Sequence, residues 1–324
     1  MRFTHIYVEE RALEYPLTKE ILDKTPNATV IYIKHYKDVF DRKRQNAPLQ
    51  KSNQALIIAV REGNRIFKGS PVCQSFGQKN FYYASSMMNC PFDCDYCYLK
   101  GMYPSSNMVV FVNLEDYKKD VEEKLKEGPM YVCASYDTDL LAMNALTGHA
   151  DFWKDLALSH DDLLVELRTK AAVDVKDDIS NVIYAFTLSP EEVVNRFEHN
   201  TAPVSARINA AAKALESGAK VRLCFDPVIK IPGWEDAYKR LVDGASSKIC
   251  FSKLTDVSVG TFRISSDYLT KMRKAYPGSE IAWYPYFIKD GFAQYEPGTD
   301  KAMQDYVLSL IGELIGKEKI FTWN

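Results

Sequence analysis

The segment CPFDCDYC, residues 90–97, brings three cysteines together in a C-x3-C-x2-C spacing that could hold a metal centre. Thiolates are soft ligands that suit zinc and iron–sulfur clusters. A structural zinc ion takes four protein ligands, and all five histidines of the chain lie far from Cys90, Cys94 and Cys97 in sequence. A [4Fe–4S] cluster held by these three thiolates would leave one iron open to an outside ligand. The spacing therefore favours an iron–sulfur cluster with a vacant coordination site.

Two other interpretations of the cysteine segment remain open. Cys73 lies upstream and Cys133 lies on another predicted strand, so either could complete a zinc site from a distance. The three cysteines could also be buried without a metal, although their tight spacing is not typical of core residues. Phe92 and Tyr96, inside the segment, suit a partly dry cluster.

A recurring pattern must position this segment: short β-rich runs alternate with amphipathic helical patterns. The predicted strands cover residues 4–8, 29–33, 55–60, 81–85, 108–112, 130–135, 163–169, 182–188, 221–226 and 256–260. The predicted helices cover residues 18–24, 114–127, 149–159, 190–197, 203–217, 234–245 and 266–275. Near-continuous apolar strands that alternate with helices indicate a parallel sheet with helices outside it.

This alternation predicts an α/β fold with an open barrel. Roughly six strand–helix units follow residue 80, fewer than the eight that close a full barrel. We therefore expect a partial (β/α)6 TIM-type barrel over residues 79–324 and a smaller N-terminal α/β domain over residues 1–78. Functional groups collect at the carboxyl ends of the strands in such sheets. Because the cysteine segment follows the predicted strand 81–85, it should lie at the functional rim.

Composition narrows the class of protein. The chain has 324 residues, 46% of them hydrophobic, with a net charge of −2 and seven cysteines. No strongly basic balance points to nucleic acid, so such binding would need a local patch. The start MRFTHIYVEE does not read as a signal peptide, no apolar run is long enough for a membrane span, and the cysteine count is odd. We expect a cytoplasmic protein with reduced thiols and no membrane partner.

The cysteine spacing, with an aromatic residue before the last cysteine, resembles the signature of the radical S-adenosylmethionine superfamily. A closer resemblance links the chain to the spore photoproduct lyase family. It is carried by IYVEERALEYPLTKEIL (6–22), CDYCYLK (94–100), FVNLED (111–116), ASYDTDLLAMNALTG (134–148), LRTKAAVDV (167–175), RFEHNTAPVSARINAA (196–211) and GWEDAYKRL (233–241). It covers most of the chain up to about residue 245 and is weaker beyond.

The resemblance implies a carbon–carbon lyase that repairs the UV-induced spore photoproduct, 5-thyminyl-5,6-dihydrothymine, in DNA to two thymines during spore germination. The implied cofactors are a [4Fe–4S] cluster and S-adenosyl-L-methionine, from which a 5′-deoxyadenosyl radical starts cleavage of the C–C bond. The implied partners are damaged DNA and an electron donor such as flavodoxin or ferredoxin. Two alternatives are a radical S-adenosylmethionine enzyme of this family with another substrate, and a non-catalytic module that binds zinc.

The resemblance also assigns site residues. Cys90, Cys94 and Cys97 carry over as cluster ligands, and Tyr96 and Tyr98 lie near the cluster and the cofactor. The residues implied to bind the cofactor are Tyr98, Thr138, Asp139, Lys170, Thr187 and Arg207. Lys170 would neutralise the methionine carboxylate in a partly dry site. Arg207 could approach the carboxylate or a phosphate, or could be an ordinary surface arginine on a helix.

One departure concerns the hydrogen donor. The best-known members carry a donor cysteine where this chain has Tyr136. Cys133 lies three residues earlier on the predicted strand, and side-chain alternation would place it on the opposite face. That favours Cys73, in the polar segment GSPVCQSFG, as donor, relayed through Tyr96, Tyr98 or Tyr136; otherwise Cys73 is a loop cysteine without a role. Core packing is the expectation for Cys133, Cys224 and Cys250.

A second departure lies near the C-terminus, where the family inserts a basic hairpin into damaged DNA. WYPYFIKDGFAQYEP, residues 283–297, reads as a hairpin around an Asp-Gly turn, without the expected arginine. The aromatic residues Tyr286, Phe287, Phe292 and Tyr295 could stack on bases, with Lys289 the nearby cation. The alternative is a hairpin that packs its aromatics on the barrel. The basic clusters at 34–45 and 269–274 could contact DNA phosphates or simply be solvated.

Overall fold

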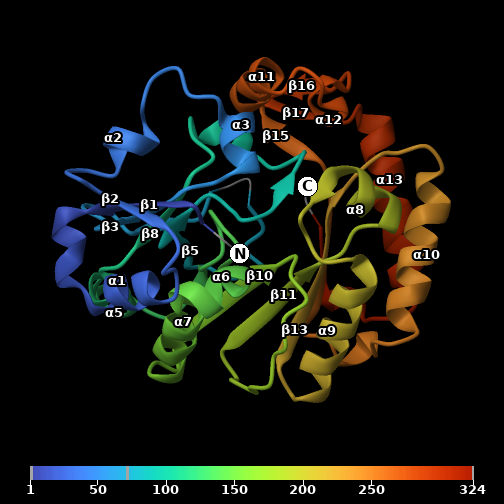
Figure 1. Cartoon of the computed structure of the whole chain (residues 1–324). Coiled ribbons are helices and arrows are strands. Elements are labelled where there is room, and N and C mark those ends of the chain that lie inside the picture. Colours follow the sequence, from blue (N-terminus) through green and yellow to red (C-terminus); the bar gives the residue numbers. More distant parts are fainter. Residues whose placement is uncertain (1–2, 71–72, 323–324) are drawn as a thin grey trace.

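A computed structural model describes residues 3–70 and 73–322 and shows an α/β protein built around two main sheets (Figure 1). The smaller sheet has the order β2-β1-β3-β8-β6. Its strands are β1 (His5–Glu9), β2 (Thr29–Ile33), β3 (Leu56–Ala59), β6 (Met87–Met88) and β8 (Met108–Phe111). The pairs β1–β2, β1–β3 and β3–β8 are parallel, and β6 joins β8 in antiparallel register. The larger sheet carries the site.

The larger sheet has eight strands in the order β18-β14-β13-β11-β10-β9-β5-β4. They are β4 (Ile66–Lys68), β5 (Phe81–Ala84), β9 (Met130–Cys133), β10 (Leu163–Thr169), β11 (Val182–Thr187), β13 (Lys220–Val228), β14 (Asp256–Thr261) and β18 (Ile320–Thr322). The six strands from β5 to β14 run parallel throughout. β4 adds to one edge in antiparallel register and β18 to the other in parallel register. The predicted partial barrel is confirmed.

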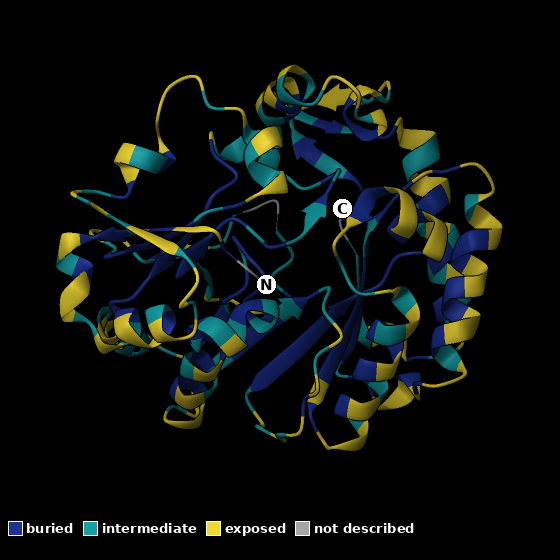
Figure 2. Ribbon diagram, in the orientation of Figure 1, coloured by how far each residue is buried: buried dark blue, intermediate teal, exposed yellow. Residues whose placement is uncertain are grey.

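Helices cover the outer side of this curled sheet (Figure 1). The longer ones are α1 (Pro16–Asp23), α5 (Leu114–Leu125), α6 (Leu140–Thr147), α7 (His149–Leu158), α8 (Glu191–Phe197), α9 (Val204–Glu216), α10 (Trp234–Ser246), α11 (Ser266–Ala275) and α13 (Pro297–Ile311). The short ones are α2 (Lys37–Phe40), α3 (Ala47–Ser52), α4 (Leu99–Met102) and α12 (Glu280–Trp283). Figure 2 shows the strands buried and the helices exposed on their outward faces. In the described ranges, every helix is too short or too polar to cross a membrane.

Local sequence explains where several helices begin and end. α6 starts after Asp139, whose carboxylate accepts the amide hydrogen of Ala142, and stops at Gly148 in a left-handed conformation with φ of 65°. α9 starts after Pro203 and turns Ile208, Ala210, Ala211 and Ala214 toward the barrel. These short side chains let the helix pack closely on the sheet beneath it.

Each main sheet contains a strand from the other side of the predicted domain boundary. The strand predicted at 108–112 as part of the barrel is β8, and it pairs with β3 in the smaller sheet, so that placement was wrong. Conversely, β4 precedes residue 78 and pairs with β5 of the barrel. Local patterns identify a strand but do not specify which distant edge it joins. The division at residue 78 stays a prediction.

The predicted C-terminal hairpin is present. β16 (Phe287–Lys289) and β17 (Phe292–Gln294) pair in antiparallel register around Asp290 and Gly291, whose φ angles are 49° and 81°. Positive φ at both central residues is the backbone that an Asp-Gly turn supplies. β15 (Arg263–Ser265) pairs with β17, so the hairpin forms a three-stranded sheet beside the barrel mouth.

Candidate active site

The cysteine loop lies at the mouth of the barrel and is fixed by backbone pairing. β7 (Asp93–Cys94) pairs with β12 (Glu198–His199), so that Cys94 lies opposite Glu198. Lys51 Nζ donates to the carbonyl oxygen of Cys90 at 2.6 Å, and the amide of Asp95 donates to that of Phe197 at 2.8 Å. The loop is therefore held by α3 on one side and by the end of α8 and β12 on the other.

Most of the predicted site residues line one cavity of about 400 Å³, which is within the range of about 300–1,000 Å³ for small-molecule sites. The cavity brings together thiols, phenols, hydroxyls, carboxylates, guanidinium groups and an ammonium group from several strands and the loops that follow them. The predicted residues among its lining are Cys73, Cys90, Cys94, Tyr96, Cys97, Tyr98, Tyr136, Thr138, Asp139, Lys170, Thr187 and Phe292.

The donor set in this cavity fits an iron–sulfur cluster and a polar cofactor. The three thiols converge on the cavity as predicted from their spacing, and burial raises the pKa of Cys94 to about 12. In the described ranges no three His, Cys, Asp or Glu side chains are arranged to hold one metal ion. A cluster differs from a single ion because each thiolate binds its own iron. The buried hydroxyls of Ser135 and Thr138 lack partners among the described residues and line the same cavity, so a ligand could satisfy them.

Lys170 is held at the end of β10 beside a buried anion. Burial alone would lower the pKa of Lys170, but the negative charges of the Cys94 thiolate and the Glu198 carboxylate outweigh it and raise the pKa. Its ammonium lies 5.3 Å from the ring centroid of Tyr96. Tyr96 Oη donates to Glu198, and Ser189 Oγ donates to the same carboxylate oxygen at 2.7 Å. The ammonium therefore stays charged at the edge of the cavity.

Arg207 supports this arrangement from behind the cavity wall. It is fully buried, and its Nη2 lies 2.6 Å from Glu198 Oε2. Its Nε donates to the carbonyl of Ala202 at 2.8 Å and Nη1 to that of Thr187 at 3.2 Å. Neither expectation for Arg207, a cofactor contact or a surface arginine, matches this position. A buried arginine needs a carboxylate partner, and Glu198 supplies it.

Asp139 organises the ends of two neighbouring strands. Its carboxylate accepts from the amide of Lys170 at 2.8 Å and from Thr169 Oγ1 at 2.9 Å, besides capping α6. Burial raises the pKa of Asp139, and these donors oppose the rise. The side chain predicted as a cofactor contact thus also fixes the backbone that presents Lys170.

Cys73 and Tyr136 meet in the cavity. Cys73 Sγ lies 3.3 Å from Tyr136 Oη, and Tyr98 Oη donates to the carbonyl of Tyr136 at 2.6 Å. The ring of Tyr136 also stacks on Tyr83 with centroids 4.2 Å apart. Burial raises the pKa of the Cys73 thiol, so it keeps its S–H hydrogen. Residues 71 and 72 of the segment GSPVCQSFG lie outside the described residues.

The other cysteines correct two expectations. Cys133 lines the same cavity as Tyr136, because β9 ends at Cys133 and the alternation of a strand does not extend through the turn that follows. Its thiol donates to Glu166 at 3.4 Å. Cys250 is exposed rather than packed in the core, since it follows α10 on the surface. Cys224 is buried in β13, as expected.

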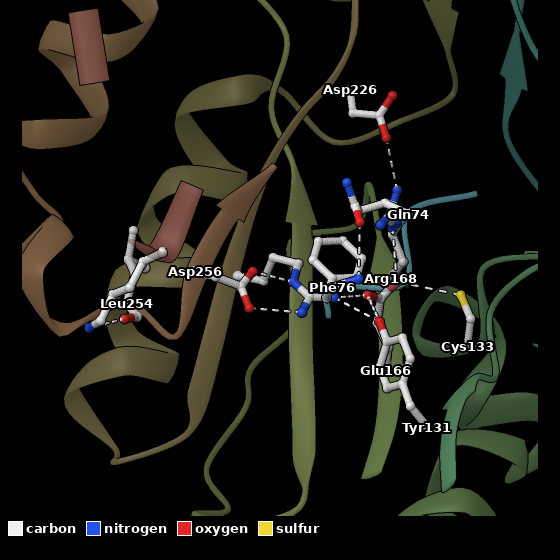
Figure 3. A network of polar contacts seen from close by, with 11 residues as sticks. Gln74, Phe76, Tyr131, Cys133, Glu166, Arg168, Asp226, Leu254 and Asp256 are labelled. Atoms are coloured by element: carbon white, nitrogen blue, oxygen red, sulfur yellow. Dashed lines mark hydrogen bonds and ion pairs between the residues drawn. The ribbon is translucent and has the colours of Figure 1, made fainter. Parts of the chain in front are cut away.

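A buried polar network along one wall of the cavity was not predicted (Figure 3). Glu166 accepts from Tyr131 Oη at 2.5 Å and from Arg168 Nε at 3.0 Å, and it also pairs with Arg222. Arg222 forms a bidentate ion pair with Asp256, in which Nη2 donates to Oδ2 at 2.8 Å. Charged residues inside the apolar strands VELRT and VRLCFD were the available signal, because buried charges require partners.

This network also holds the loop that carries Cys73. The ring centroid of Phe76 lies 3.2 Å from the guanidinium carbon of Arg222, and Phe76 is buried with φ of 52°. Positive φ at a bulky residue is an outlier that surrounding contacts must sustain. Gln74 Nε2 donates to the carbonyl of Thr322 in β18 at 2.7 Å. The C-terminal strand and the barrel interior therefore fix the loop together.

The hairpin residues divide between surface and core. Lys289 and Phe287 are exposed, and Phe292 lines the cavity. Tyr295 is buried and its Oη accepts from the amide of Lys230 at 2.9 Å, so its prediction as a DNA contact is corrected. Tyr286 packs against Phe262, with ring centroids 5.1 Å apart, at the base of the hairpin. Aromatics on both arms looked equivalent in sequence, but Tyr295 follows the end of β17 and turns inward to bond the amide of Lys230.

A curled parallel sheet with three cysteines at its mouth and a ligand-sized cavity beside them defines the class of partial-barrel proteins that use radical S-adenosylmethionine chemistry. A family profile described as "Spore photoproduct lyase" matches residues 2–283. The chain belongs to the spore photoproduct lyase family.

Three comparisons show how far the likeness extends. The chain is 24% identical to spore photoproduct lyase of Bacillus subtilis (strain 168), covering 97% of this chain and 96% of that protein. It is 23% identical to spore photoproduct lyase of Geobacillus sp. (strain Y412MC61), covering 83% and 80%. A solved structure of a spore photoproduct lyase mutant with bound AdoMet and dinucleoside spore photoproduct matches with a TM-score of 0.81 at 19% identity, covering 99% and 98%.

Proposed function

We propose that this protein repairs spore photoproduct in DNA to two thymines by radical S-adenosylmethionine chemistry. The observation that carries the proposal is the single cavity, which joins the three thiols of the cysteine loop to the Cys73–Tyr136 pair. A site for starting a radical and a site for quenching it are thus within reach of one bound substrate. Family membership and the curated relatives support the same activity.

In this proposal Cys90, Cys94 and Cys97 hold a [4Fe–4S] cluster, and Lys170 binds the carboxylate of S-adenosylmethionine. When bound, this pair would supply the 5′-deoxyadenosyl radical that abstracts hydrogen from the lesion. Asp139 holds the backbone of Lys170, and the Ser135 and Thr138 hydroxyls offer hydrogen bonds to the polar parts of the cofactor. Tyr98 and Thr187 complete the wall.

Cys73 is the proposed hydrogen donor. Its S–H bond would break as its hydrogen atom joins the thymine methyl radical that remains after the bridging bond is cleaved. Tyr136 Oη, 3.3 Å from Cys73 Sγ, could then return a hydrogen atom to the sulfur and leave the radical on the phenol. Tyr98 and Tyr96 extend this chain of phenols toward the cysteine loop. Both steps conserve hydrogen atoms and need no further reactant.

The proposed substrate is damaged duplex DNA. The methylene carbon of the lesion is hidden in an intact stack, so the adduct must leave the duplex to reach the cavity. Phe292 at the cavity, with Phe287 and Lys289 exposed on the hairpin, offers an apolar wedge and one cation for this step. We further propose a cytoplasmic site of action, an electron donor of the flavodoxin or ferredoxin type, and a role in spore germination.

A second candidate is a radical S-adenosylmethionine enzyme of the same family that acts on a different substrate. The replacement of the usual donor cysteine by Tyr136, and a hairpin with Lys289 as its cation, favour this alternative. Incubation of anaerobically reconstituted, reduced protein with S-adenosylmethionine and dinucleoside spore photoproduct separates the two. Clean thymine release supports repair, whereas 5′-deoxyadenosine without thymine supports the second substrate. A colourless sample loaded with zinc would overturn both.

The donor assignment is tested in the same assay with Cys73→Ala and, as a matched control, Cys250→Ala on the surface. Cys73→Ala should still consume the lesion but give by-products of an unquenched thymine radical. Cys250→Ala should behave as the unmodified protein. Clean repair by Cys73→Ala would show that another group returns the hydrogen.

A further inference from the structure

A second, small cavity lies against the cysteine loop. It measures about 20 Å³, and Cys90 and Cys97 line it as they line the large cavity. Its other walls come from the rest of the cysteine loop, from α3, from α4 and the loop that follows it, and from Tyr276 just after α11. Residues from these segments include Ala47, Lys51, Leu99, Lys100 and Tyr276. Two of the proposed cluster ligands therefore border a second cavity outside the large one.

The segments around this cavity lie close together, and α4 packs directly on α11. A side chain on Gly101 of α4 would come within 2.5 Å of Tyr268 in α11, so these two helices are in direct contact. Tyr276 follows α11 and shares the small cavity with Ala47 and Lys51 of α3. In Figure 1, α11 lies at the upper edge and α3 lies just below it in the view.

The surface around these segments is rich in cations. Three exposed cations, Arg42, Lys43 and Arg44, lie in the turn between α2 and α3, and Lys271 and Lys274 are exposed on α11. We call these five residues, together with Lys51, the basic face.

Acidic side chains offset part of this charge, among them the exposed Asp267 on α11. The carboxylates beside the small cavity, Asp93 and Asp95, already pair with Lys100 at 2.8 Å and 3.1 Å. Asp38 and Asp41 stand near the start of the face.

The face is also directly connected to the cysteine loop. Lys51 Nζ donates to the carbonyl of Cys90 at 2.6 Å, and Gln54 Nε2 donates to the same oxygen at 3.2 Å. Few covalent and hydrogen bonds therefore separate the surface from a thiolate of the proposed cluster. The large cavity, by contrast, opens beside the hairpin that we assign to DNA.

We propose that the basic face is the docking surface for a small acidic electron-carrier protein that reduces the cluster. This inference rests on the proposed function, because it requires a cluster at the three cysteines. Positive charge around the entry point attracts an acidic partner and orients it with its redox centre toward Cys90 and Cys97. The same cations could instead bind DNA phosphates, which is the competing outcome of the test.

The test compares two charge-reversed proteins with equal net charge. Lys43→Glu/Lys274→Glu changes the basic face, and Lys213→Glu/Lys220→Glu changes exposed lysines on α9 and at the start of β13. Each reconstituted protein is reduced anaerobically by an acidic flavodoxin or by dithionite, and loss of cluster absorbance is followed in time. A third arm measures repair of a duplex oligonucleotide that carries the lesion, with dithionite as reductant.

Docking predicts that only the flavodoxin arm slows in Lys43→Glu/Lys274→Glu, by about tenfold or more at low salt. The rate of the unmodified protein should also fall as salt screens the face. Equal flavodoxin rates in both variants would overturn the proposal, as would a loss confined to the duplex arm, which would assign the face to DNA. Because cluster reduction is observed directly, the docking test stands even if the lesion proves not to be the substrate.

Discussion

Replacing Arg222 with methionine should destabilise the fold more than any loss of a surface ion pair. The guanidinium joins β13 to Asp256 of β14, to Glu166 of β10 and to Tyr131 of β9, and all of these side chains are buried. Methionine fills most of the same volume but leaves Asp256 without a cation. Removing one partner from a buried ion pair typically costs about 3–5 kcal/mol, because the remaining charge stays desolvated.

That cost should appear in thermal unfolding. For a chain of this length, each kcal/mol of lost stability lowers the melting midpoint by about 2 °C. The Arg222→Met protein should therefore melt about 6–10 °C below the unmodified protein. The matched control is Arg240→Met, which removes an exposed arginine paired with Glu192 and should shift the midpoint by no more than about 2 °C. Circular dichroism melts at neutral pH give both values.

A second variant keeps the reasoning testable if Arg222→Met fails to fold. Arg222→Met/Asp256→Leu removes the stranded carboxylate with the arginine, and apolar replacement of a whole buried ion pair is often close to neutral. The double variant should therefore be more stable than Arg222→Met. A midpoint for Arg222→Met within 1–2 °C of Arg240→Met, or a double variant less stable than the single one, would show that the network does not hold these strands together.

Three further outcomes follow from the site. Burial opposes it, but the neighbouring arginines lower the pKa of Glu166 in the folded protein to about 2. The stability that ionised Glu166 contributes is therefore complete above its unfolded-state pKa near 4.5 and is lost as the pH falls toward 2. The free energy of unfolding, measured by urea titration, should decline across that pH window. Lys170→Met should weaken S-adenosylmethionine binding by about tenfold or more in equilibrium titrations of reconstituted protein, because a cation facing its carboxylate is lost; unchanged affinity would contradict the assignment. Tyr295→Phe should cost about 1–3 kcal/mol of stability by leaving the amide of Lys230 without its acceptor, while DNA affinity in a gel-shift assay stays unchanged.

Much of the fold could be predicted from the sequence, because most of its longer strands and helices have a recognisable hydrophobic pattern over several residues. The run TVIYI became β2 over the same five residues, and LLVELRT became β10. Several elements were missed, the longest of them α13 over Pro297–Ile311, and two of the misses have identifiable reasons. α6, LLAMNALT, is apolar around much of its circumference and shows little periodicity, and β18 has only three residues at the chain end. The sheet joined by β8 depends on distant pairing, which local pattern does not encode.

Some residues of the site could also be predicted from local sequence, whereas others depend on contacts between distant segments. Cys90, Cys94 and Cys97 are close in sequence, so their spacing alone brings them to one loop. Arg207 meets Glu198 only because β12 pairs with the cysteine loop and α9 folds back behind it, and sequence spacing does not show this. The prediction that Cys133 and Tyr136 lie on opposite faces was wrong, because side-chain alternation applies only while the strand continues.

The position of Cys73 explains why an interior network matters to a surface loop. A donor at the end of a strand is held by the sheet itself, whereas a donor on a loop needs separate anchors. Here Phe76 packs its ring on Arg222 and keeps a positive φ, while Gln74 bonds to the C-terminal strand through Thr322. If Cys73 is the donor, the buried ion network does two things: it joins the strands of the barrel, and it fixes the distance between a thiol and the substrate. In this chain Tyr136 stands after the strand end and the thiol lies on the loop. The anchors that hold the loop are therefore needed for the thiol to act as donor.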